Sequence, residues 1–502
     1  LSVLTTFCYA QTATVKRGDK QYDKFIYIDA TKTYEHVAEK GYKSEDMFQK
    51  MDNAYYFNGD LANAAKWYGE LFAMNSKLAP EYYYRYSQSL RSVGQYEKAD
   101  EMMALFTEKN TEDSRGKIYT ENKNYLEVIK TNSGRFTIAD AGINSKYSDY
   151  GSAIVNDELV FTTARDTGNF ATKIHKWSNQ YFTNLYSAKI ISPDSLGRPE
   201  KFAKKMKTKF HESTPVFTKD GKTMYFTRNN FNDGKRQRDE NRITLLKIYK
   251  ATFVDSTWTD ATEVSFNSNN YNVAHPSLSA DEKTLYFASD MPGTLGQSDI
   301  FKVSINEDGT FGKPENLGKT INTEGKESFP LITDENELYF TSNGLPGLGG
   351  LDIFVSRIDA DGNYTTPINI GAPANSPQDD FAYLINTETR KGFLTSNRDG
   401  GKGSDDIYRF TETRKLICKQ VLSGIVTDID TKEVLANTKI TLFDNQFNKI
   451  AEVMSNDKGF YTFEVECGKS YYVRGEKEEY DTNEQKVNIP EATGKTDLPI
   501  ML

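Results

Sequence analysis

The sequence predicts a multidomain chain of α plus all-β class: a helical repeat array, then a five-bladed β-propeller, then a small β-sandwich. Three observations lead to this prediction. Helical periodicity fills residues 15–110, strand-rich units repeat over 134–413, and residues 415–502 are strand-rich without that repeat. At about 150 residues per domain, 502 residues leave room for roughly three domains.

Composition excludes several classes of function. The net charge is −9 and no run of basic residues occurs, so nucleic acid is not an expected partner. No stretch of 18 apolar residues is present, which argues against a transmembrane helix in this sequence. Only 4 His occur (positions 36, 175, 211 and 275), without common spacing, so we expect no metal site, no cofactor and no His-based catalysis.

The first ten residues, LSVLTTFCYA, carry no charge and resemble the end of a secretory signal cleaved after Ala10. A lipoprotein reading would make Cys8 the lipidated residue. Phe7 stands where such signals have a small residue, so ordinary cleavage is the favoured interpretation. Residues 1–10 are therefore predicted to be a signal remnant, and the protein to be exported.

Cysteine usage agrees with export. Without Cys8 the chain keeps Cys418 and Cys467, both in its last 90 residues. In an oxidising compartment such a pair predicts a structural disulfide; the alternative is two buried thiols.

Residues 11–112 are predicted to form helical hairpins. Gly59 and Gly94, 35 residues apart, fall at turns between helices, and Ala64 and Ala99 fall where two helices touch. This pattern is typical of tetratricopeptide repeats. Six residues are expected to face the concave groove and bind a protein partner: Gln49, Asn53, Tyr56, Tyr84, Gln88 and Arg91. The alternative is a solvated polar face on a spacer. Residues 113–133 are a charged connector.

Residues 134–413 are predicted to form five propeller blades of about four strands each. Asp299, Asp352 and Asp406 recur at intervals of 53 and 54 residues. A four-stranded unit cannot cover its own faces, so the blades must close into a ring, and the strand around 135–142 is expected to complete the last blade. Each repeated Asp is expected to accept N–H groups of the Gly-rich turn before it, rather than to bind calcium or act in catalysis.

Two loops between strands are unusually long, at 166–183 and 229–245. Long loops on a rigid scaffold often carry recognition, and the alternative is a mobile rim. The Gly-rich segment GLPGLGG (344–350) is followed by a strand and not a helix, which argues against phosphate binding. No G-x-S-x-G occurs, and no nucleophile has an evident base.

Residues 415–502 are predicted to form a small antiparallel sandwich with a hairpin turn at 456–459. Alternation of apolar residues predicts these inward side chains: Val426, Ile440, Leu442, Phe460, Phe463 and Val473.

The order of these modules resembles the OmpA-family multidomain envelope proteins. The motifs LYFTSN…G-x-D-I-F in the blades and DKGFYTFEVECGKSY in the sandwich carry the resemblance. Such proteins combine helical repeats, a TolB-like propeller and a carboxypeptidase-regulatory-like sandwich, and the layout is similar to PorE-type components of type IX secretion. In that family an OmpA-like, peptidoglycan-binding domain follows, and nothing like it is present in this sequence.

The resemblance implies a non-enzymatic scaffold in the periplasm, associated with the outer membrane. It would bind envelope proteins through the helical groove and the propeller, serving secretion or gliding, and reach peptidoglycan only through the absent domain. The alternative is a propeller-based hydrolase or a glycan-binding protein. Clustered carboxylates with perturbed pKa values in a deep central funnel would favour that alternative.

Overall fold

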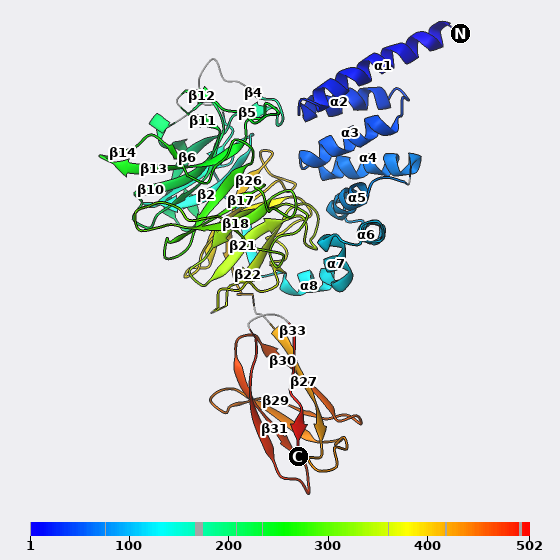
Figure 1. Ribbon diagram of the computed structural model, residues 1–502, viewed down its shortest axis with the longest axis vertical. Helices are drawn as coiled ribbons and strands as arrows, with labels where there is room; N and C mark the ends of the chain where they lie inside the picture. Colours follow the sequence, from blue (N-terminus) through cyan, green and yellow to red (C-terminus); the bar gives the residue numbers. More distant parts are fainter. Residues whose placement is uncertain are drawn as a thin grey trace. The chain divides into compact units, whose positions relative to one another are not determined.

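The computed structural model describes residues 2–75, 77–165, 174–206, 208–232, 234–359, 361–416, 419–490 and 494–502, and within these ranges the side chains from residue 11 onward except those of residues 205 and 419. Two compact units are present: residues 1–355 with 368–414, and residues 356–367 with 415–502. The helices and most of the strand-rich repeat thus share one unit. The class is mixed, with helices first and strands in the rest of the chain (Figure 1).

Eight helices open the first unit in the part of the chain that the structure describes. Consecutive helices contact one another and form stacked hairpins, seen in blue and cyan in Figure 1. Gly59 and Gly94 adopt positive φ of 71° and 74° at two of the turns, which a residue with a Cβ rarely adopts. The helices are α1 (Ser2–Tyr22), α2 (Tyr27–Ala38), α3 (Glu45–Phe57), α4 (Leu61–Met74), α5 (Pro80–Ser92), α6 (Tyr96–Lys109), α7 (Ser114–Glu121) and α8 (Tyr125–Asn132).

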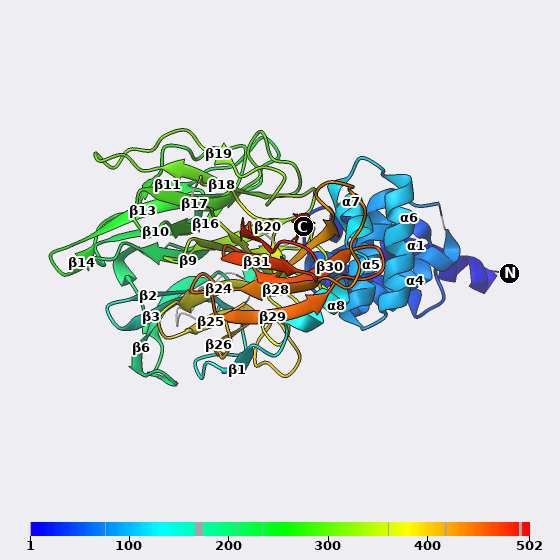
Figure 2. The ribbon, with the colours of Figure 1, turned by 90° about the horizontal axis from the view of Figure 1, so that it is seen from below.

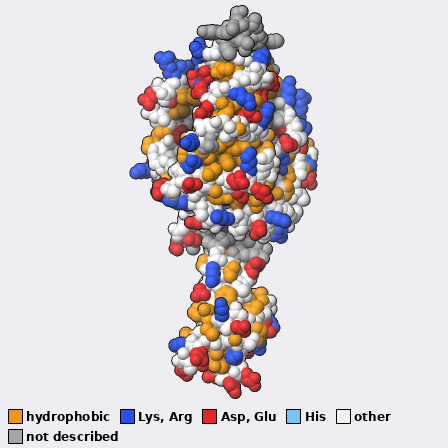
Figure 3. Space-filling model, turned by 90° about the vertical axis from the view of Figure 1, so that its right-hand side faces the viewer, with side chains coloured by type: hydrophobic (Ala, Val, Ile, Leu, Met, Phe, Trp, Pro, Cys, Tyr) orange, Lys and Arg blue, Asp and Glu red, His pale blue; other side chains and the backbone are white. Residues whose placement is uncertain are grey.

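The core between the helices consists of aromatic side chains and small residues such as alanine. Ala64, Ala99 and Tyr68 are fully buried, because the small side chains let neighbouring helices approach while the ring fills the space between hairpins. Pro80 occupies the first turn of α5, where its missing N–H costs nothing. Figure 3 shows the outer face of the array, where hydrophobic side chains are interspersed with charges of both signs. No described helix is long and apolar enough to cross a membrane.

Five antiparallel sheets follow. The first three are sheet I, with β2 (Asp149–Val155), β3 (Glu158–Thr163), β6 (Asn184–Ser192), β7 (Ser195–Leu196) and β8 (Glu200–Lys201); sheet II, with β9 (Glu212–Phe217), β10 (Thr223–Asn229), β13 (Leu246–Val254), β14 (Thr257–Trp258) and β15 (Thr262–Glu263); and sheet III, with β16 (Val273–Leu278), β17 (Thr284–Ser289), β18 (Asp299–Ser304) and β19 (Glu315–Asn316).

Sheet IV consists of β20 (Glu327–Ile332), β21 (Glu337–Ser342), β22 (Asp352–Arg357) and β23 (Ile368–Asn369). Sheet V combines β24 (Asp380–Asn386), β25 (Lys391–Ser396) and β26 (Asp406–Glu412) with β1 (Phe136–Asp140), which comes from before sheet I. Two short hairpins, β4 (Ile174–His175) with β5 (Gln180–Tyr181) and β11 (Phe231–Asn232) with β12 (Lys235–Arg236), and a 3-10 turn η1 (Lys204–Met206) lie in the connections.

The first strands of the sheets contact one another in the cyclic order β2, β9, β16, β20, β24 and back to β2. β1 pairs with β26 in register from Phe136–Glu412 to Asp140–Tyr408, so the start of the repeat completes its last sheet. In Figure 2 the strands of successive sheets lie beside one another, from β18 and β17 to β3 and β6. We call this arrangement the five-sheet ring; it is consistent with a β-propeller.

The second unit has two sheets around one apolar core. The strands are β27 (Lys419–Thr427), β28 (Lys439–Phe443), β29 (Lys449–Met454), β30 (Phe460–Glu466), β31 (Ser470–Glu476), β32 (Asn483–Asn488), β33 (Gly494–Asp497) and β34 (Ile500–Met501).

Two predictions for this unit were wrong. β33 and β34 pair in parallel with β27, so the sheets are not purely antiparallel. Phe460 is exposed, because the alternation along β30 turns Tyr461, Phe463 and Val465 inward and leaves the even-numbered side chains outside.

Candidate active site at the mouth of the five-sheet ring

The residue before each innermost strand occupies an equivalent place in the five sheets, and these residues are Ser148, His211, Asn272, Lys326 and Asp379. Each innermost strand then carries a register shift, with a residue of positive φ at the same position: Gly151, Thr214, His275, Phe329 and Ala382. Such bulges bend a strand and re-aim neighbouring side chains. The repeat therefore presents a different polar side chain from each sheet at one end of the ring.

A cavity of about 590 Å³ lies at this end. The ring contributes polar side chains to its wall, among them Asn272, His275, Asp290, Gln297, Lys326 and Asp379. The helices contribute Tyr27, Tyr56, Phe57 and Gln88, and Trp177 comes from the long connection of sheet I. Its size is that of a small-molecule site.

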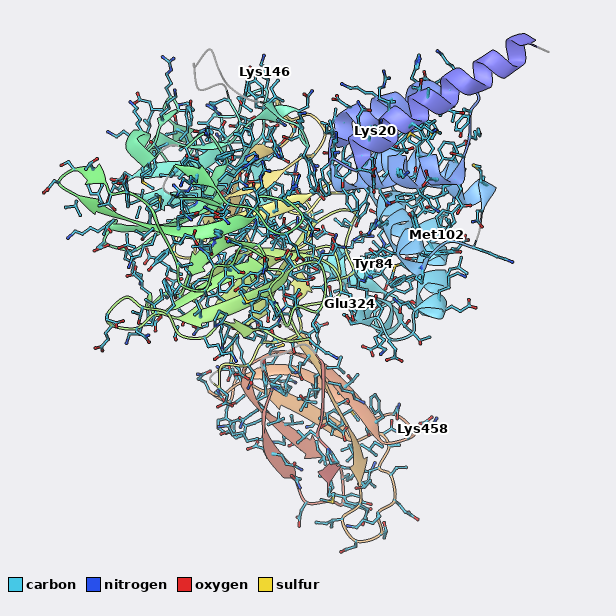
Figure 4. All side chains as sticks on the ribbon, turned by 45° about the horizontal axis from the view of Figure 1, so that its top comes forward. Lys20, Tyr84, Met102, Lys146, Glu324 and Lys458 are labelled. Atoms are coloured by element: carbon cyan, nitrogen blue, oxygen red, sulfur yellow. The ribbon has the colours of Figure 1, made fainter. Side chains whose placement is uncertain are left out.

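The helices reach this cavity because they dock on the ring through the segment that follows β21. The hydroxyl of Tyr84 and the side-chain amide of Gln88 both donate to the carbonyl oxygen of Asn343. The amide of Asn343 in turn donates to the hydroxyl oxygen of Tyr56 over 3.3 Å. Nearby, the backbone N–H of Ser114 donates to Glu324 at 3.1 Å; Figure 4 labels Tyr84 and Glu324 at this boundary.

Two glycines allow the close approach. A Cβ on Gly350 would lie 3.1 Å from a methyl carbon of Leu61 in α4 and 2.2 Å from a carboxylate oxygen of Asp379. A Cβ on Gly59, after α3, would lie 2.8 Å from the other carboxylate oxygen of Asp379. Asp379 is therefore enclosed by the helical turn on one side and the ring on the other.

The predicted partner groove thus faces the protein's own ring. Of its six residues, Tyr56, Tyr84 and Gln88 meet around Asn343, whereas the other three make contacts within the helices. Gln49 bonds Glu45 at 2.9 Å, Asn53 accepts from Tyr68 and Arg85 at 3.0 and 2.8 Å, and Arg91 lies over the ring of Tyr125 at 5.0 Å.

Asp379 is the most perturbed carboxyl group of the cavity. Burial raises its pKa to about 6, and the charges of Asp405 and Asp380 act in the same direction. A hydrogen bond from the N–H of Leu351 at 2.8 Å and the positive charge of Lys326 partly oppose this rise. Near neutral pH, Asp379 is therefore poised to hold or release a proton.

Two charged neighbours of Asp379, Lys326 and Asp405, also have shifted pKa values. Desolvation lowers the pKa of Lys326, while the charge of Asp379 raises it; the residue lines the cavity and is exposed to solvent. The ammonium group of Lys326 has no hydrogen bond or ion pair among the described residues. Burial raises the pKa of Asp405, and the hydroxyl of Ser148, which donates to it at 2.5 Å, lowers it.

His275 is held neutral. Burial lowers its pKa to about 3, and the charge of Lys326 lowers it further. Its ring stacks on that of Phe329, with centroids 3.8 Å apart. His275 therefore supplies an uncharged wall and not a general acid.

The two long loops behave differently. In the first, residues 166–173 lie outside the described residues, but Trp177 lines the cavity and contacts Tyr27 and Phe25 with centroid distances of 4.9 and 5.9 Å. In the second, the described charged side chains are largely exposed, and none of these lines the cavity.

The repeated turn carboxylates do not converge on this site. Asp299 accepts the N–H of Leu295 at 2.8 Å, Asp352 that of Leu348 at 2.6 Å, and Asp406 that of Gly403 at 3.0 Å. All three are buried, each beside its own turn.

Cys467 is disulfide-bonded, and its predicted partner Cys418 lies outside the described residues. Among the described residues no group of three or more His, Cys, Asp or Glu could hold a metal ion.

The sequence-based prediction missed the pair Lys326 and Asp379. One signal was available: an acidic residue opens the innermost strand in four sheets, at Asp149, Glu212, Glu327 and Asp380. Aligning these four positions would have pointed to the residue before each of them.

No family model matches the chain, and no curated protein does. The solved structures similar to it include an α-L-arabinofuranosidase from Lactobacillus brevis (13% identity, 54% of this chain and 93% of that one, TM-score 0.35). They also include a family 117 glycoside hydrolase from Zobellia galactanivorans (13%, 55% and 90%, 0.35) and a family 32 β-fructofuranosidase from Bombyx mori (9%, 71% and 89%, 0.36).

These comparisons correct several predictions. Membership of the OmpA family and the PorE-like layout are contradicted, because no family model matches and the similar structures are glycoside hydrolases. The same structures contradict a non-enzymatic scaffold. The helical hairpins are present, but their assignment as tetratricopeptide repeats is not shown. The periplasmic location and the envelope partners stay predictions.

Proposed function

We propose that the protein is a glycan-active hydrolase whose five-sheet ring is a five-bladed β-propeller with the active site at its mouth. The observation that carries the proposal is Asp379, a carboxyl group with a pKa of about 6 inside a cavity walled by aromatic and polar side chains. The cyclic contacts of the five innermost strands support the propeller.

Hydrolysis of a glycosidic bond needs a proton donor and an ionised carboxylate. Asp379 in its protonated form donates to the leaving oxygen, because its pKa keeps a share of it protonated near neutral pH. Asp405 is the candidate second group: its charge acts on Asp379, and although burial raises its pKa, the hydroxyl of Ser148 opposes this rise by stabilising the ionised form. As the bond between the anomeric carbon and the leaving oxygen breaks, water adds its hydroxyl group to that carbon and gives its remaining proton to the ionised carboxylate of Asp405.

The wall suits a sugar. Tyr27, Phe57 and Trp177 offer flat apolar faces for the C–H faces of a pyranose or furanose ring, and the side chains of Asn272 and Gln297 can bond its hydroxyl groups. The ammonium group of Lys326 has no hydrogen-bond partner among the described residues. It can donate a hydrogen bond to a hydroxyl group of the sugar or pair with a negatively charged substituent of the sugar.

The test is hydrolysis of a panel of nitrophenyl pentosides and hexosides and of plant and bacterial oligosaccharides by the full chain. Asp379→Asn should lower kcat by at least about 100-fold with unchanged circular dichroism. Asp308→Asn, at an exposed turn, is the matched control and should keep full activity. No turnover of any substrate by the unchanged protein, or an active Asp379→Asn variant, would overturn the proposal.

A further inference from the structure

A separate cavity of about 790 Å³ lies where the ring closes, between the last sheet and the first. We call it the seam cavity. Its lining is mostly apolar and comes from both sides of the seam, chiefly Ile154, Ile190, Leu196, Leu384 and Phe393. Asp379 and the other residues of the candidate active site take no part in it.

The register of sheet V explains the space. Arg409 of β26 lies opposite Ala139 of β1 on one side and Phe393 of β25 on the other. Because Ala139 is a single methyl group, this face of the sheet is hollow beside the guanidinium. At the rim, the side chains of Ile154 and Ile191 are 46% and 66% exposed, so the apolar wall continues to solvent.

The charged groups of the cavity are not balanced. Lys391 and Asp194 bridge the seam as an exposed ion pair at 3.3 Å and neutralise one another. Arg409, half-buried in the wall, has no hydrogen bond or ion pair to any residue that the structure describes. One uncompensated positive charge thus stands beside a long apolar space.

We propose that the seam cavity binds a single-chain amphiphile with a carboxylate head, such as a medium-chain fatty acid. The alkyl chain fills the apolar space, and the carboxylate forms a bidentate pair with the guanidinium of Arg409. The volume is within the range of small-ligand sites. Neither the helical array nor the hydrolytic chemistry is needed for this binding, so it stands independently of the proposed function.

The experiment is a titration of the full chain with 11-(dansylamino)undecanoic acid followed by fluorescence, with competition by octanoate, decanoate and dodecanoate. Affinity should rise about fourfold per methylene, as expected for burial of an alkyl chain. Arg409→Gln should weaken dodecanoate about tenfold and leave dodecanol unchanged, because the alcohol has no charge to lose. Lys319→Gln, at an exposed site outside the cavity, is the control for overall charge.

A blocking variant separates the cavity from the surface. Ala139→Trp, at an exposed position of β1, should fill the space and abolish binding without unfolding the ring. No saturable binding, equal affinity for dodecanoate in Arg409→Gln, or full binding by a folded Ala139→Trp would each overturn the proposal. Sedimentation with vesicles of phosphatidylglycerol should recover no protein; binding to vesicles that survives Ala139→Trp would assign the affinity to a bilayer surface instead.

Discussion

The side-chain amide of Asn343 donates a hydrogen bond to the hydroxyl oxygen of Tyr56 over 3.3 Å, and its amide oxygen accepts the backbone N–H of Lys326 at 2.8 Å. One residue therefore connects the helices to Lys326, which precedes β20 and lines the cavity. The groove expected to hold a partner protein instead closes over the mouth of the protein's own ring.

Asn343→Ala should loosen this docking. It removes both side-chain bonds of Asn343 but keeps the backbone carbonyl that Tyr84 and Gln88 bond, so we expect a partial effect of about 1–2 kcal/mol on local opening. Hydrogen exchange should become faster in α3 and α5 and stay unchanged in β17. Asn306→Ala, in an exposed turn of sheet III, is the control. Unchanged exchange in both helices would show that Asn343 does not hold them.

The pH profile of hydrolysis follows from Asp379. The acid must be protonated, so kcat/KM should fall as the pH rises through about 6. Lys326→Met removes a positive charge that lowers the pKa of Asp379, so the fall should move to higher pH. Lys319→Met is the control and should leave the profile in place. A shift to lower pH in Lys326→Met would contradict the assignment of Asp379 as the proton donor.

Local chemistry made parts of the fold predictable. The inter-helix turns could be located from Gly59 and Gly94, since a left-handed backbone there requires glycine. The strand around 135–142 could be assigned to the last sheet because an incomplete blade leaves an unpaired edge, and β1 does pair with β26.

The site was not predictable in the same way. Lys326 and Asp379 are 53 residues apart and differ in type, and only the packing of sheet IV against sheet V places them within electrostatic reach. The concave face that includes Tyr56 has the same polar character whether it binds a separate protein or a segment of its own chain. Sequence periodicity describes which face a residue is on, and it does not identify what covers that face.

Asp52 of α3 should make stability depend on pH. Its side chain is fully buried, neither carboxylate oxygen has a hydrogen-bond partner in the described part of the chain, and burial raises its pKa well above 3.8. The folded state then binds a proton that the unfolded state releases, so this contribution is intact below the unfolded-state pKa and is lost as the pH rises through the folded-state pKa.

Asp52→Asn removes the ionisable group. We expect a free energy of unfolding at pH 8 that is higher by about 1 kcal/mol or more, with a smaller gain at pH 5. Urea unfolding at both pH values measures the difference, and Asp46→Asn, on the exposed side of the same helix, is the control. An equal effect of Asp52→Asn at the two pH values would mean that Asp52 does not titrate between them.

Glu412 forms ion pairs at the point where the ring closes, and its substitution should lower the free energy of unfolding. The carboxylate is buried in β26, where it bonds Arg135, which precedes β1, and accepts from Nε of Arg390 at 2.8 Å. Arg135 is itself buried and also donates to the carbonyl oxygen of Ile370 at 3.1 Å. Glu412→Gln leaves the buried guanidinium of Arg135 without its counter-charge and Arg390 with the carboxylate of Glu335, so the free energy of unfolding should fall by about 3–5 kcal/mol.

A matched control exists on the same network. Glu335 bonds the other side of Arg390 at 3.1 Å but is partly exposed, so Glu335→Gln should cost less than about 1 kcal/mol. Chemical unfolding of both variants, with hydrogen exchange of the β1–β26 pairing, tests the difference. Because Glu412 bonds Arg135 beside β1, whereas the bond of Glu335 is to Arg390, exchange at Thr137 and Ala139 should accelerate in Glu412→Gln and not in Glu335→Gln. Equal destabilisation by the two substitutions would place the effect in the charge of Arg390 rather than in closure of the ring.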